Sequence, residues 1–77
     1  MNKERRKELN KAVNALNDVI SIIEDVKYDE EYAYNNLPES FQESYRGEQM
    51  EENIDEMDEA IEGIKEVISL LDAIIYK

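Results

Sequence analysis

Two long stretches of this 77-residue chain carry apolar residues at alternating intervals of four and three. In the second stretch these residues are Met50, Ile54, Met57, Ile61, Ile64, Ile68, Leu71 and Ile75, and in the first they are Leu9, Val13, Leu16, Ile20 and Ile23. Such spacing places one continuous apolar seam along an α-helix. The sequence therefore predicts an all-α fold in which two long helices pack against each other as an antiparallel helical hairpin.

The predicted hairpin is a single domain of residues 1–77. Helix 1 is expected at about 2–34, a connection at about 35–45 and helix 2 at about 46–76. Pro38 lies in the connection, where its fixed φ suits the first turn of a short helix. Ser40 and Glu43 have the spacing of a capping box, which predicts that a helical segment begins at Ser40.

The apolar arc on each helix is wider than one partner helix can cover. Beside the two seams lie Ala12, Ala15, Val19, Ile22 and Val26 in helix 1, and Ala60, Val67, Leu70 and Ile74 in helix 2. A lone hairpin would leave this apolar surface in water. We therefore expect a homo-oligomer, at least a dimer that forms a four-helix bundle, or a larger helical assembly. The expected oligomer interface comprises Leu9, Val13, Leu16, Val19, Ile22, Val67, Leu70 and Ile74.

Two features of the helices each have two interpretations. An uncharged polar stripe suits either a half-buried, hydrogen-bonding interface or a solvated flank. Its residues are Asn10, Asn14, Asn17 and Ser21. Gly63 costs a helix about 1 kcal/mol relative to alanine, so it either permits a close helix crossing or is simply tolerated.

The formal charge of −11 is unevenly distributed along the chain. The first eleven residues carry a net charge of +3, which leaves −14 for the rest. Their basic members are Lys3, Arg5, Arg6, Lys7 and Lys11. Either this end is solvated, or it packs against the acidic first half of helix 2 in another, antiparallel chain. Direct nucleic-acid binding is not expected, because the chain is acidic overall and no aromatic residue interrupts the basic segment.

The residue types present argue against catalysis. The chain has no histidine and no cysteine, which excludes an imidazole base, a thiol nucleophile and a zinc–thiolate site. We expect no enzyme, no cofactor and no metal site. Two lesser alternatives use the acidic residues of helix 2. Glu51, Glu52 and Asp55 resemble half of the metal motif of all-α nucleotide pyrophosphohydrolases, and an acidic stripe can act as an inhibitor that mimics the phosphates of DNA.

Aromatic residues gather around the connection. Tyr28, Tyr32, Tyr34, Phe41 and Tyr45 lie within eighteen residues, and Tyr76 is the only aromatic residue elsewhere. Tyrosine rings stack on bases and arginine binds phosphate, so this segment has the groups to bind a small nucleotide or a protein partner. The alternative is that the rings cap the end of the bundle. The candidate binding residues are Tyr34, Asn36, Tyr45 and Arg46, together with Arg5 and Arg6 of the basic N-terminal segment.

The connection also resembles a known pattern. Asn36-Leu-Pro-Glu-Ser, followed by Arg46-Gly-Glu-Gln-Met-Glu-Glu-Asn-Ile-Asp, is similar to short, uncharacterised acidic helical-hairpin proteins of bacteria and their phages. The resemblance covers about residues 28–62, and Phe41 and Tyr45 depart from the pattern. It implies a hairpin fold and a phage counter-defence role. The analogy is with small oligomeric phage proteins that sequester cyclic-nucleotide immune signals in pockets between protomers.

No apolar run in the sequence reaches the length of a membrane span, and the charged start does not resemble a signal peptide. We therefore expect a cytoplasmic protein of a bacterial host cell that binds no membrane. The predicted function is non-enzymatic: a self-associating acidic module that binds a protein partner or sequesters a ligand, as a phage sponge for cyclic nucleotides would.

Overall fold

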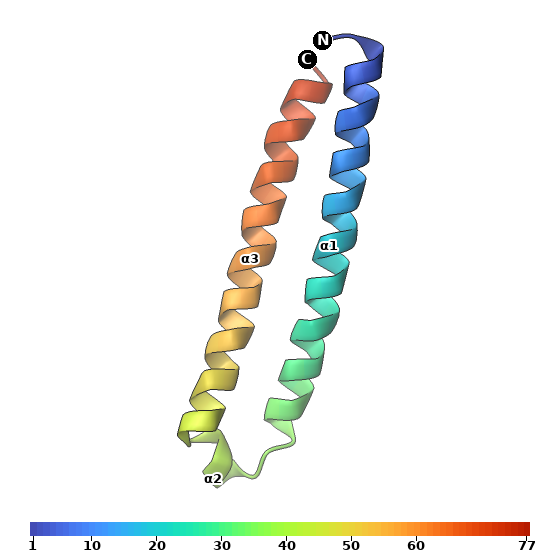
Figure 1. Cartoon of the computed structure of the whole chain (residues 1–77). Helices are drawn as coiled ribbons and strands as arrows, with labels where there is room; N and C mark the ends of the chain where they lie inside the picture. The colour runs from blue at the N-terminus through green and yellow to red at the C-terminus, as the bar shows by residue number, and fades with distance from the viewer.

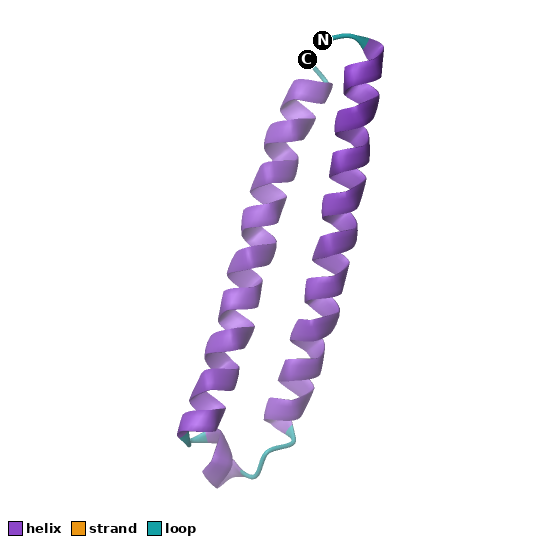
Figure 2. Cartoon of the chain, in the orientation of Figure 1, coloured by secondary structure: helices purple, strands orange, loops and turns teal.

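The computed structural model describes residues 1–77 and contains three helices. α1 runs from Lys3 to Asn35, α2 from Glu39 to Gln42 and α3 from Tyr45 to Ile75. α1 and α3 lie side by side and antiparallel, with α2 at the turn and both termini at the open end (Figure 1). The remaining residues form loops (Figure 2). The all-α antiparallel hairpin is confirmed, and both long helices begin and end within one residue of the expected bounds.

The apolar seam predicted from the four-three spacing forms the core of the hairpin. All of its residues are buried or half-buried. The most deeply buried are Val13 and Ile20 on α1, and Met50, Ile61 and Ile75 on α3. Removal of these side chains from water is the main force that holds the two helices together.

The core is thin, because two helices alone cannot surround a side chain. Only six residues are buried, and no side chain is buried completely. The radius of gyration is 17.5 Å, against about 11.5 Å for a compact domain of this length. The accessible surface of 5875 Å² is roughly 1,000 Å² larger than that of a compact monomer of the same mass. The single hairpin therefore leaves an unusually large share of its surface in water.

Side chains cap both long helices at their N-termini. The Asn2 side chain accepts a hydrogen bond from the backbone N–H of Arg5 (2.8 Å). The Ser44 hydroxyl accepts one from the backbone N–H of Gly47 (3.5 Å). Each cap satisfies a donor that the first turn of a helix leaves without a backbone partner.

The predicted capping box at Ser40 and Glu43 is wrong. Ser40 lies inside α2, and no side chain caps that helix. An N-cap residue needs extended backbone, which Ser44 has with φ −83° and ψ 171° and which a helical serine lacks. Pro38 is itself the N-cap of α2, one residue before the first helical position expected for it.

The turn depends on a close approach between α2 and the start of α3. The Gln42 side-chain amide donates to the carbonyl oxygens of Tyr34 and Leu37 (both 3.1 Å), which ties α2 to the end of α1. Gly47 is buried in α3, and a Cβ there would lie 2.1 Å from the carbonyl oxygen of Gln42. Gly47 is thus the residue that lets α3 begin directly against α2. Gly63, in contrast, has open space around it, so it permits no close crossing inside the hairpin.

Gly47→Ala is expected to lower the free energy of unfolding by about 2 kcal/mol, because α2 must move to admit the methyl group. Gly63→Ala is the matched control, since it adds the same methyl group in open space and should stabilise the helix by up to about 1 kcal/mol. Urea denaturation followed by circular dichroism, at one protein concentration, measures both variants. Native stability in Gly47→Ala would contradict the packing described for the turn.

Candidate interaction surface

A second stripe of apolar residues on each long helix is exposed. These residues are Ala12, Ala15, Val19, Ile22 and Val26 on α1, and Ala60, Gly63, Val67, Leu70 and Ile74 on α3. They too recur at intervals of three and four, so each set forms a line along its helix. Ile22 and Leu70 are the most exposed of the large side chains among them, at 62% and 67%. We call the two stripes together the apolar face.

Both stripes lie on the same broad side of the hairpin. Each is displaced from the seam of its own helix by about 100°, in the same rotational sense when viewed from the N-terminus of that helix. Because α1 and α3 are antiparallel, an equal rotation in the same sense places both stripes on the same broad side of the hairpin. Accordingly, Ile22 and Val26 of α1 and Ala60 of α3 line one open groove of about 470 Å³. The apolar face is therefore continuous across the hairpin.

The opposite broad side of the hairpin is polar. Its α1 edge is the stripe of Asn10, Asn14, Asn17 and Ser21, all exposed except the half-buried Asn10. In the single chain this stripe is a solvated flank, because it lies on the side away from the apolar face. The two broad sides of the hairpin thus differ sharply in character.

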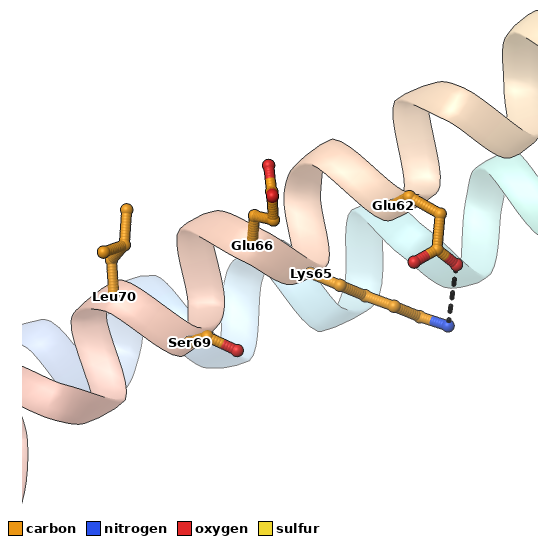
Figure 3. A pocket seen from close by; sticks show the side chains of 5 residues that line it. All are labelled: Glu62, Lys65, Glu66, Ser69 and Leu70. Carbon is orange, nitrogen blue, oxygen red and sulfur yellow. Dashed lines mark ion pairs between the residues drawn. The ribbon is translucent and has the colours of Figure 1, made fainter.

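A shallow hollow of about 580 Å³ lies on α3 alone. Its lining side chains are Glu62, Lys65, Glu66, Ser69 and Leu70 (Figure 3). Lys65 Nζ lies 3.7 Å from the Glu62 carboxylate, whereas Glu66 and Leu70 project from the other side of the ribbon (Figure 3). Since α1 contributes no side chain, the hollow is the surface of one helix rather than a binding cleft.

The residues expected in an oligomer interface divide into two groups. Val19, Ile22, Val67, Leu70 and Ile74 are exposed on the apolar face. Leu9, Val13 and Leu16 instead occupy the seam and are buried or half-buried within their own chain. The seam already uses these three side chains, so an interface has to be built from the exposed five.

The turn presents aromatic side chains to solvent. Tyr28, Tyr32, Phe41 and Tyr45 are each more than half exposed. None of the four therefore covers the core of its own chain. Only Tyr34, which is half-buried, lies between the helices at this end.

Several candidate binding residues at the turn already have partners within the chain. The Tyr34 hydroxyl donates to the Glu51 carboxylate, the Asn36 amide donates to the carbonyl oxygen of Tyr32 (2.7 Å), and the Tyr45 hydroxyl accepts from the Gln49 amide (2.9 Å). Arg46 is exposed. None of the four hollows on the surface is lined by these residues.

Arg5 and Arg6 lie at the open end of a hairpin that is 58 Å long. The Arg6 Nε is shielded from solvent without a hydrogen-bond partner. One chain therefore does not bring these two arginines together with the candidate residues of the turn. The two groups can meet only between chains.

The acidic residues of α3 do not converge. No group of three or more carboxylates in the structure is placed to hold a metal ion. The pyrophosphohydrolase alternative therefore gains no support from the geometry. None of the helices combines the length and the apolar character needed to cross a bilayer.

In the half of the hairpin next to the turn, polar residues take the seam positions of α1 and pair with residues of α3. These cross-helix pairs are Lys27 with Asp58 (2.7 Å), Glu30 with Asn53 (3.2 Å) and Tyr34 with Glu51. The α1 members of the pairs continue the four-three spacing beyond Ile23. These contacts were not predicted, although the continued spacing signals that the three side chains face α3.

Two of these pairs shift a pKa. The hydrogen bond to Asp58 raises the pKa of Lys27 above its ordinary 10.5, against the effect of partial desolvation. The hydrogen bond to Glu51, reinforced by desolvation and by the carboxylate charge, raises the pKa of Tyr34 above its ordinary 10.0. In both pairs the folded chain holds the proton more tightly than the unfolded chain. Their contribution to stability is complete below about pH 10 and is lost as the pH rises through the raised pKa.

Comparison with protein-family models, curated proteins and solved structures finds no match to this chain. The resemblance of the turn to the short hairpin proteins of bacteria and phages therefore stays a prediction.

Tyr34→Phe is expected to flatten the alkaline part of the stability profile, because it removes a proton that the folded state binds more tightly. The free energy of unfolding at pH 8, 9, 10 and 11 measures the slope. Tyr32→Phe is the control, since the exposed Tyr32 hydroxyl makes no hydrogen bond in the hairpin, and it should keep the native slope. A native slope in Tyr34→Phe would contradict the Tyr34–Glu51 contact.

Proposed function

We propose that this chain acts by binding rather than by catalysis, and that it assembles with a second copy through the apolar face into a four-helix bundle. The observation that carries the proposal is the exposure of large apolar side chains, such as Ile22, Val26 and Leu70, on one side of the hairpin. Soluble monomers rarely expose so continuous an apolar surface. Covering it with a second hairpin would give each chain the core layer that two helices cannot build alone.

A dimer interface of ordinary size would cover only a small part of the hairpin surface. A stable interface buries about 800 Å² on each partner, which is roughly one-seventh of the 5875 Å² that the hairpin exposes. The groove beside Ile22, Val26 and Ala60 offers space for side chains of the second copy. The small residues Ala60 and Gly63 at this level of α3 favour a close approach of the backbones.

The double variant Ile22→Lys/Leu70→Lys is expected to be monomeric at micromolar concentration, where the native chain is a dimer. Two lysines on each face would have to be buried without partners, at a cost of several kcal/mol in dimer stability. Light scattering coupled to size-exclusion chromatography measures the mass, and circular dichroism measures the helix content.

Asn14→Lys/Asn17→Lys is the matched control, because it adds the same charge to the polar side of the hairpin. This variant should remain a dimer. A stable, folded native monomer at micromolar concentration would overturn the proposal, and so would equal dissociation of the two double variants.

A second candidate function is ligand sequestration at the turn. The observation that favours it is the exposure of four aromatic rings in the turn and the adjoining end of α1, where Arg46 is exposed as well. Exposed rings and a free guanidinium suit a ligand with a base and a phosphate, such as a cyclic nucleotide. The acidic surroundings oppose such an anion, so the basic end of another chain would have to contribute.

Calorimetry with cyclic nucleotides and ADP-ribose-type nucleotides tests this second function. Arg46→Ala is expected to weaken binding at least about tenfold, through loss of charge-assisted hydrogen bonds to phosphate. Lys65→Ala is the control, because Lys65 lies far from the turn on α3, and it should bind as the native chain does. Binding of none of these nucleotides, or native affinity in Arg46→Ala, would remove the ligand hypothesis.

A further inference from the structure

The charges of the hairpin are divided between its two ends. The open half, residues 1–19 and 66–77, carries six basic and five acidic side chains, for a net charge of +1. The turn half, residues 20–65, carries three basic and fifteen acidic side chains, for a net charge of −12. Lys27 pairs with Asp58, and residues 19 and 66 each lie eight positions from these residues toward the open end, so they are at the same level of the hairpin. The boundary between the two halves therefore lies at one level along the long axis.

The apolar face is centred close to this boundary between the two halves. On α1 it extends seven residues to either side of Val19, which is the middle residue of that helix. On α3 it extends seven residues to either side of Val67, which lies at almost the same level as Val19. A two-fold axis that runs across the face at the level of both valines therefore places a second copy of the face on the first with the direction reversed.

Two identical hairpins can stack face to face in two ways. With both turns at one end, two segments of charge −12 would lie side by side, about one interhelical spacing of 8–10 Å apart. At that distance salt screens such charges only partly. With the turns at opposite ends, each half of charge −12 lies against a half of charge +1. The same apolar face is buried in both arrangements, so the charge favours the second of them.

We propose that a second copy of this chain docks on the apolar face in the reverse direction, with the two turns at opposite ends of the bundle. This inference rests on the proposed function, because it assumes the dimer and fixes its orientation. The two-fold axis passes near Val19 and Val67, so each of these residues packs beside its equivalent in the second copy.

Spin labels measure the orientation directly. The chain has no cysteine, so Ser40→Cys in the exposed α2 provides one attachment site for a nitroxide in each chain. Pulsed dipolar spectroscopy then gives the distance between the two labels in a dimer whose mass is established by light scattering. Turns at opposite ends predict a separation close to the 58 Å length of the hairpin. Turns at one end predict less than about 25 Å, from the interhelical spacing and the label arms.

A mixture of chains labelled at Ser40→Cys and chains labelled at Lys3→Cys is the complementary test, because reverse docking separates identical labels but brings the two different labels close together. Reverse docking predicts that the mixture gains a short distance, below about 25 Å, that neither sample shows by itself. A dimer with a short distance between Ser40 labels would overturn the orientation and leave the proposed function standing. A monomeric mass without any dipolar signal would overturn the proposed function itself.

Discussion

The contact between the two four-three seams is the interaction on which the rest of this structure depends. It is the only extensive apolar contact within the chain, and no helix outside the pair shares it. A seam of this kind fixes both the pairing of the helices and their rotation about their own axes. Once that rotation is fixed, every other residue of α1 and α3 is assigned to a side of the hairpin.

This rotation turns the remaining apolar residues into one face. The side chains of Val19, Ile22 and Leu70 cannot reach the seam, and the antiparallel packing directs them to a common side. The hairpin therefore has a thin core, a large accessible surface and a polar side opposite an apolar one. These properties follow from the same geometry, and self-association resolves them together.

The turn shows a different kind of constraint. At this end the seam positions of α1 carry polar residues, and pairs such as Lys27 with Asp58 add direction to the packing but little burial. The connection is held instead by local contacts, namely the Ser44 cap and the close approach of Gly47 to Gln42. The exposed tyrosines Tyr28 and Tyr32 take no part in these contacts.

From the amino-acid sequence we could predict the all-α hairpin, the bounds of its long helices and the residues of its core, because a period of four and three is a property of the chain alone. The sequence also predicted that apolar residues would remain uncovered. It did not identify Ser44 as the N-cap of α3, since Ser40 and Ser44 are both good caps and only their backbone conformation separates them.

The folded hairpin was needed to show that the two uncovered stripes share one side and that Tyr34 faces Glu51. Both features depend on the direction and register in which α3 returns along α1. That register is set by contacts between residues far apart in the sequence, and a periodic pattern read along one helix does not contain it.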